Sequence, residues 1–172
     1  YFETELKADQ EFMVDYSFDY HVNYVELDPA KVSEEQPDFC LEEQAPHIVF
    51  TPYLRELRDE LAGDETNPII LARRFYDFVT TKVMYSFMRE YFTIECIPEY
   101  CAINLKGDCG VQALLFITLC RMSGIPARWQ SGLYATEYYT GCHDWAQFYV
   151  APYGWVFADP SFGGSAWRAG EK

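Results

Sequence analysis

The sequence lacks several features that would assign its class at once. It has no internal repeat, no low-complexity segment and no apolar run near the ~18 residues of a membrane-spanning helix. Basic residues are scarce: 13 Lys and Arg stand against 27 Asp and Glu, which gives a net charge of −14. Because nucleic-acid binding needs a cationic face, we expect no nucleic-acid partner. The charge favours an acidic, solvated surface, and an attraction for cationic peptides is the second interpretation.

Metal-binding cysteine patterns are also absent. The sequence has no C-x-x-C pair and no Cys/His finger spacing, so we predict no structural zinc site and no cofactor. The six cysteines occupy positions 40, 96, 101, 109, 120 and 142. Cys96 and Cys101 could form a short disulfide in an exported protein or remain free thiols. Cysteine usage therefore leaves the compartment open, and the oligomeric state is open as well.

The length of 172 residues and the 49% hydrophobic composition favour one globular domain with a substantial core. We divide it into an N-terminal β segment, residues 1–46, that packs on a core spanning residues 47–172. The chain begins at Tyr1 without a methionine or a signal-like stretch. We therefore expect it to be an excised domain or a processed form of a longer protein.

Alternating large apolar and polar residues over positions 11–27 predict a long antiparallel strand or hairpin. Two amphipathic helices follow, each with a start signal of a capping residue and a proline. Thr51-Pro52 opens the first, which Gly63 ends, and Asn67-Pro68 opens the second. A third helix, from Cys109 to about Ser123, is apolar on nearly all sides and is predicted to be buried.

The remaining sequence predicts strands. Residues 127–133 form one strand, residues 134–142 a polar loop, and residues 143–150 and 155–159 a hairpin around 152–154. This gives an α+β fold, with the buried cysteine helix packed on a mostly antiparallel sheet. In that hairpin register Asp159 pairs with Gln147, four residues from His143, so a bulge or offset is needed to bring Asp159 and His143 together.

Cys109 is the most informative residue. It stands at the mouth of the buried helix, where unpaired N–H groups and the helix dipole favour a thiolate and can hold an oxyanion. His143 and Asp159 follow in the sequence. A thiol, an imidazole and a carboxylate are the parts of a cysteine-centred acyl-transfer site. We expect Cys109 to be the one fast-reacting thiol.

Four pieces of sequence resemble the transglutaminase-like superfamily of papain-type thiol enzymes. They are Gly107-Asp-Cys109, Gly124-Ile-Pro-Ala-Arg128, His143-Asp-Trp145 and Gly154-Trp-Val-Phe-Ala-Asp159-Pro160. The resemblance covers about residues 70–164. It implies that Cys109 is the nucleophile, that His143 is the general base and acid, and that Asp159 orients His143.

The leading interpretation is a thiol hydrolase, a bacterial-type peptidase or amidase acting on a peptide or protein substrate. A protein-glutamine cross-linking acyltransferase and an inactive binding module of the same fold are the alternatives. The N–H of Cys109 is the first oxyanion donor, and Asn104 is the candidate for the second. Asp108 is expected to cap the cysteine helix, where its charge would oppose thiolate formation.

Overall fold

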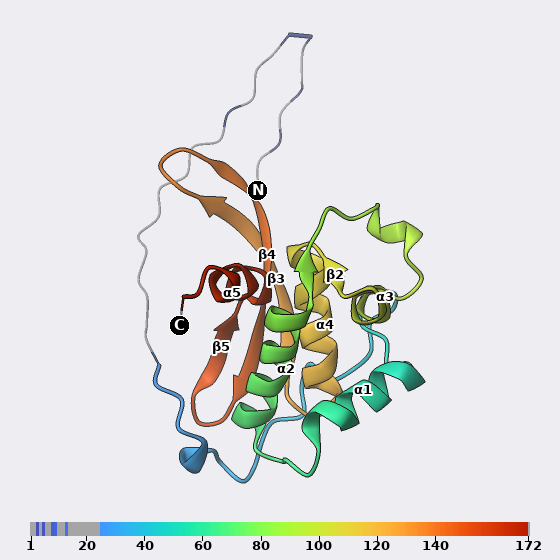
Figure 1. Cartoon of the computed structure of the whole chain (residues 1–172). Coiled ribbons are helices and arrows are strands. Elements are labelled where there is room, and N and C mark those ends of the chain that lie inside the picture. The colour runs from blue at the N-terminus through green and yellow to red at the C-terminus, as the bar shows by residue number, and fades with distance from the viewer. Residues whose placement is uncertain (1–2, 4, 6–7, 10–12, 14–24, 172) are drawn as a thin grey trace.

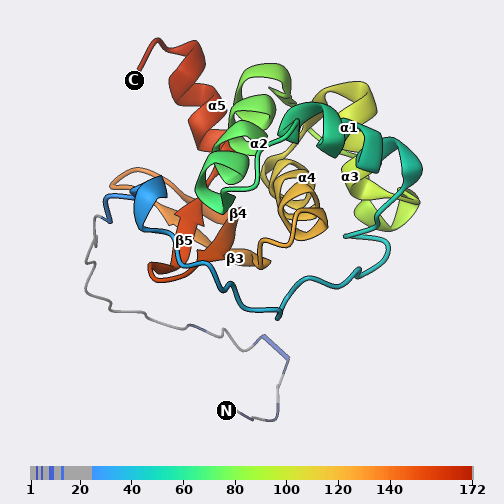
Figure 2. The same ribbon diagram turned by 90° about the horizontal axis from the view of Figure 1, so that it is seen from below.

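The computed structural model describes residues 3, 5, 8–9, 13 and 25–171. In this part of the chain, five α-helices accompany a three-stranded antiparallel sheet, so the predicted α+β class is confirmed. Figure 1 shows the arrangement, and Figure 2 shows α1 to α4 gathered on one side of the sheet. None of the helices in the described residues is long and apolar enough to cross a membrane.

Both amphipathic helices begin where their capping signals predict. Helix α1 spans Pro52–Ala62 and α2 spans Pro68–Lys82. The side chains of Thr51 and Asn67 each accept a hydrogen bond from a first-turn N–H, at 3.2 and 3.1 Å. Gly63 ends α1 with a φ of +54°, a conformation that favours glycine.

Six shorter elements are absent from the prediction made from the sequence. They are η1 (Pro29–Lys31), β1 (Met84–Tyr85), η2 (Tyr91–Thr93), α3 (Ile97–Asn104), β2 (Lys106–Gly107) and α5 (Pro160–Arg168). Helices of eight or nine residues are marginal alone, so tertiary packing must stabilise α3 and α5. Strands β1 and β2 are parallel and pair Tyr85 with Gly107, which brings the β1 end beside the start of the cysteine helix.

Helix α4 (Cys109–Met122) forms the centre of the core, and its predicted burial is confirmed. Twelve of its fourteen residues are buried. Phe116, which is fully buried, has its ring centroid 6.3 Å from that of Tyr76 on α2 and 5.9 Å from that of Phe148 on the sheet. This helix therefore joins the helical layer to the sheet.

A buried arginine fastens the far end of α4. The Arg121 guanidinium donates through Nε to the carbonyl of Ala127 (2.8 Å) and through Nη1 to the carbonyl of Glu42 (2.6 Å). Burial lowers the pKa of Arg121. With this end tied to the sheet and to the N-terminal segment, the Cys109 end of α4 is left as the open one.

The sheet consists of β3 (Ala127–Ala135), β4 (Thr140–Val150) and β5 (Gly154–Ala158), with β4 in the middle. The prediction of a loop over residues 134–142 is wrong, because β3 and β4 pair as far as Ala135 with Thr140. Figure 1 shows this hairpin projecting beyond the helices. Both its faces are exposed near the tip, so the alternation that marks a half-buried strand is missing.

The β4–β5 register also differs from the predicted one. Gly154, with a φ of +81°, pairs with Val150 and begins β5, so the loop is 151–153. Gln147 consequently pairs with Phe157. Asp159, just beyond β5, is then level with Trp145 and only two residues from His143. Diagonal neighbours at that separation are within reach of long side chains, so no bulge is required.

The predicted strand over residues 11–27 lies largely outside the described residues. Residues 25–27, at its end, belong to no strand. The division into a segment of residues 1–46 and a core of residues 47–172 stays a prediction.

The position of Phe116 predicts a large effect on stability. Phe116→Ala removes a ring from the junction of α2, α4 and β4, and we expect it to lower the free energy of unfolding by about 3–5 kcal/mol. Phe157→Ala is the matched control, because that ring is 61% exposed on β5, and its cost should stay below about 1 kcal/mol. Denaturant unfolding of both variants measures the difference. Equal losses would contradict the central place of α4 in the core.

Candidate active site

Cys109 is the first residue of α4, and Asp108 caps the helix as predicted. Asp108 Oδ1 accepts hydrogen bonds from the N–H of Val111 (3.0 Å) and from the hydroxyl of Tyr91 (2.5 Å). The cap satisfies one of the unpaired N–H groups at the helix start. It also fixes a negative charge next to the candidate nucleophile.

The pKa of the Cys109 thiol is raised, contrary to the expectation that the helix start would favour a thiolate. Burial is the largest cause, and the charges of Asp144 and Asp108 act in the same direction. Backbone N–H groups of Asp144 and Gly110, which hydrogen-bond to the sulfur, lower the pKa but do not prevail. Burial and the two carboxylates therefore favour the neutral thiol over the thiolate.

Asp144 is a neighbour of the thiol that the sequence analysis missed. The thiol donates to Asp144 Oδ2 at 3.9 Å. Along β4, Ala146, Phe148 and Val150 are buried on one face, and Asp144 lies on that same face. The alternation of side chains along β4 could therefore have identified Asp144, because it places residue 144 on the face that packs against α4.

The structure brings His143 and Asp159 together, as expected for the orienting pair of a triad. His143 Nε2 lies 2.6 Å from Asp159 Oδ2, and the side chains are only 12% and 6% exposed. The second oxygen, Oδ1, accepts from the N–H of Phe162 (3.0 Å) and the hydroxyl of Ser161 (2.9 Å). One carboxylate therefore caps α5 and holds the imidazole.

Aromatic rings enclose His143. The imidazole centroid lies 4.4 Å from that of Phe162, 6.0 Å from that of Trp145 and 6.3 Å from that of Tyr134. Since Nε2 faces Asp159, Nδ1 is the nitrogen left for the thiol. Among the described side chains, the Cys109 sulfur makes no hydrogen bond to this ring and instead contacts the next residue of β4.

Two tyrosines from the segment before α3 border the sulfur. The pKa of Tyr85 is raised by burial and by the nearby Cys109 and Asp108. The pKa of Tyr91 is also raised, through burial and its hydrogen bond to Asp108. Asn104, the predicted second oxyanion donor, is exposed in α3 and gives its amide hydrogen to the carbonyl of Tyr100 (2.8 Å).

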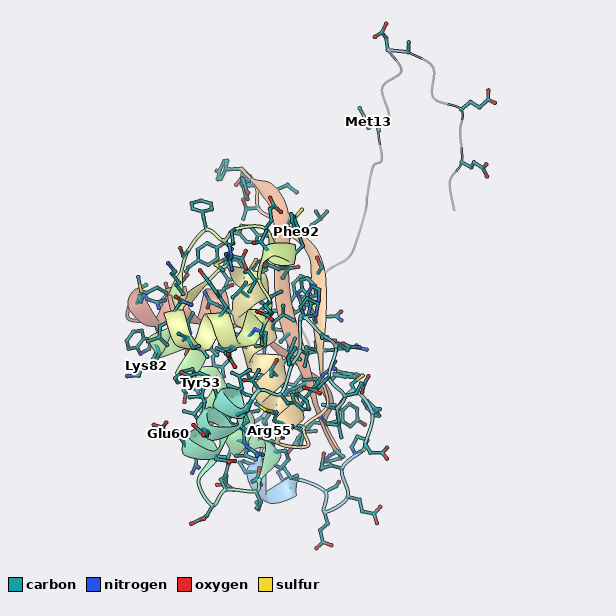
Figure 3. The ribbon with its side chains drawn as sticks, turned by 90° about the vertical axis from the view of Figure 1, so that its right-hand side faces the viewer. Met13, Tyr53, Arg55, Glu60, Lys82 and Phe92 are labelled. Carbon is teal, nitrogen blue, oxygen red and sulfur yellow. The ribbon has the colours of Figure 1, made fainter. Side chains whose placement is uncertain are left out.

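Exposed aromatic side chains flank the site from two directions. Phe87 (97% exposed) and Phe92 (85%) come from the segment after β1, and Figure 3 shows Phe92 at η2, away from α1. Tyr138 (89%) and Tyr139 (63%) come from the β3–β4 turn. Asp159 and Phe162 also line a cavity of about 890 Å³ between α2, α5 and β5.

The other cysteines are all free thiols, and Cys96 and Cys101 are not bridged. Burial raises the pKa of Cys101 to about 12, whereas Cys142 is exposed. Accessibility alone therefore does not single out Cys109. Within the described ranges, no three His, Cys, Asp or Glu side chains gather as a metal site would require.

Comparisons with known proteins identify the family and the fold of the chain. The family model of the transglutaminase-like superfamily matches residues 55–160. No curated protein sequence matches the chain significantly. A putative cysteine protease from Cytophaga hutchinsonii is similar in structure, with a TM-score of 0.60 and 21% identity, over 70% of this chain and 40% of that one.

The periplasmic domain of TgpA from Pseudomonas aeruginosa is similar as well, with a TM-score of 0.62 and 20% identity over 74% of this chain and 47% of that one. The same domain bound to ethylmercury has a TM-score of 0.60. The chain thus spans less than half the length of these structures. The family match covers most of the chain, which belongs to the transglutaminase-like superfamily.

Proposed function

We propose that the chain is a thiol hydrolase that cleaves a peptide or other amide bond through a thioester on Cys109. The observation that supports this most directly is the buried His143–Asp159 pair, held at 2.6 Å by the cap of α5. Of this pair, His143 lies on β4 and directly precedes Asp144, the residue that contacts the thiol. Acyl transfer needs such a thiol, an imidazole and an orienting carboxylate.

Each step of the reaction has a residue to perform it. His143 takes the thiol proton as the Cys109 sulfur attacks the carbonyl carbon, and an S–C bond forms. The C–N bond then breaks, and the imidazolium gives its proton to the leaving amine. Water, deprotonated by His143, attacks the thioester and releases the acid and the thiol. Asp159 stabilises the imidazolium without itself being protonated.

This scheme requires His143 and Cys109 to approach one another. Successive residues of a strand point to opposite faces, so Asp144 faces α4 while the His143 ring leans towards α5. Catalytic hydrogen bonds in unliganded enzymes are often long and tighten only when substrate binds. We propose that the imidazole pivots about its bond to Asp159 and presents Nδ1 to the sulfur.

Tyr85 replaces Asn104 as the candidate for the second oxyanion donor. Tyr85 is close enough to Cys109 for the thiol to raise its pKa, and the pairing of Tyr85 with Gly107 keeps β1 beside the first turn of α4. Together with the N–H of Cys109, it would direct two donors at the oxygen that becomes charged in the transition state.

Hydrolysis is favoured over cross-linking because the β3–β4 hairpin, which carries Tyr134 beside His143, is exposed to solvent near its tip. Tyr139 and Leu133, near the hairpin tip, are 63% and 60% exposed. An amine competes with ~55 M water only when a dry site holds it close to the thioester. The binding-module alternative is disfavoured by the complete set of thiol, imidazole and carboxylate.

The state of the thiol predicts a pH dependence. Because burial and two carboxylates raise the pKa of Cys109, its thiolate fraction should rise with pH through a midpoint above the ~8.5 of a free cysteine. The rate of iodoacetamide alkylation at Cys109, mapped by mass spectrometry in a Cys142→Ala background, gives this midpoint. A midpoint below 8 would instead indicate a preformed thiolate–imidazolium pair.

Amide cleavage should depend on Cys109 and His143. In a library of peptides and other amides, Cys109→Ala should abolish turnover, and His143→Ala should reduce it by about 10²–10⁴-fold. Cys142→Ala and His47→Ala are the matched controls, because one removes an exposed thiol and the other an imidazole that stacks on Trp129. Both controls should keep full activity. Undiminished turnover in Cys109→Ala would refute the mechanism.

Added amines should not divert the acyl group. With a labelled alkylamine at millimolar concentration and a glutamine-containing protein as acyl donor, we expect hydrolysis products and negligible incorporation of the label. Liquid chromatography with mass spectrometry measures both products. Efficient, Cys109-dependent incorporation would make the cross-linking acyltransferase the better description.

A further inference from the structure

The position of Asp144 beside the thiol follows from the packing of β4 against α4. Asp144 lies on the α4 face of β4, and its Oδ2 is 3.9 Å from the Cys109 sulfur. Gly110, in the first turn of α4, admits this carboxylate: a Cβ there would lie 3.0 Å from Oδ2 and 2.5 Å from the Tyr91 hydroxyl. The positive end of the helix dipole favours a carboxylate at this place.

Two carboxylates lie close to the Cys109 sulfur. Asp108 precedes α4, Asp144 comes from β4, and Tyr85 and Tyr91 approach from β1 and η2. Across residues 25–171, no lysine or arginine forms an ion pair with Asp108 or Asp144. The site therefore has an unbalanced negative charge.

The carboxylates of Asp108 and Asp144 differ in their hydrogen-bond partners. Asp108 Oδ1 is already engaged by the Tyr91 hydroxyl and the Val111 N–H. Asp144 has only the weak S–H donor of Cys109 as its side-chain hydrogen-bond partner within the described structure. It is the acid that remains available to a ligand.

We infer that Asp144 makes the Cys109 site selective for substrates that carry a positive charge, an ammonium or guanidinium group, beside the scissile bond. This inference rests on the proposed function and names a substrate class for it. The net charge of −14 attracts such molecules to the protein, and Asp144 places the attraction at the nucleophile. A bound cation also offsets the carboxylate that opposes the thiolate, so the same contact that selects the substrate activates the sulfur.

A set of charged alkylating agents tests the inference without knowledge of the natural substrate. 2-Bromoethylammonium is cationic, iodoacetamide is neutral and iodoacetate is anionic. Rates at Cys109 are measured by mass mapping in the Cys142→Ala background and divided by those of N-acetylcysteine amide. At a given pH all three react with one pool of thiolate, so their ratio reports local charge and not the thiol pKa.

We expect a normalised preference for the cationic over the anionic agent of about tenfold, as one nearby carboxylate would produce. Asp144→Asn should reduce this ratio severalfold, with the remainder due to Asp108, and it should also speed neutral iodoacetamide severalfold near pH 7, because removal of the carboxylate lowers the thiol pKa. Asp144→Glu should retain the preference. Glu137→Gln removes an exposed acid from the same hairpin and should change neither quantity.

A wild-type ratio of one, or an undiminished preference in folded Asp144→Asn, would overturn the inference. Circular dichroism and the thermal midpoint establish that each variant is folded. The outcome is separate from that of the proposed function. Amide turnover that survives Cys109→Ala refutes the hydrolase, whereas an absent charge preference at an alkylated Cys109 refutes only the role of Asp144.

Discussion

The burial of α4 is the constraint on which the other features of this protein depend. A helix with twelve of fourteen residues buried must be covered by α2, α3 and the sheet, and it has few polar groups to offer to solvent. Arg121 ties its C-terminal end to the sheet, so its N-terminal end is where backbone N–H groups and a side chain can meet a ligand. A rigid, buried helix also holds Cys109 at a fixed place relative to β4, which is what a nucleophile requires.

At the N-terminal end of α4, helix stability and thiolate formation require charges of opposite sign. Asp108 stabilises α4 by accepting the Val111 N–H, but its negative charge opposes a thiolate at the next residue. Burial of the sulfur adds a larger penalty of the same sign. A lowered thiol pKa therefore cannot come from the helix start alone and must come from what approaches it. An imidazole, a cationic group of the substrate, or both can supply the missing positive charge.

The sequence predicted the parts of the structure whose causes are local. The caps of α1 and α2, the burial of α4 and the cap at Asp108 follow from residues within one turn of each helix. Helix α3 and the tyrosine contacts depend on tertiary packing, so the composition of those segments was no guide. Helix α5 was missed although Asp159-Pro160 at its start repeats the cap-and-proline signal of α1 and α2. The predicted register of the β4–β5 hairpin was wrong because Gly154 begins β5 instead of ending the loop. Asp144 was missed although the alternation of β4 placed it on the α4 face.

The two neighbours His143 and Asp144 show how one strand can serve both sides of a site. Because adjacent side chains point to opposite faces, the imidazole joins the α5 side and the carboxylate joins the α4 side. Asp159 completes the first side: one oxygen caps α5 and the other holds His143, so the orientation of the imidazole is tied to the position of a packed helix. Asp144 completes the second, where Gly110 leaves room for it beside the sulfur. The anchor of the imidazole is thus set by the fold, while the carboxylate beside the nucleophile remains available to the substrate.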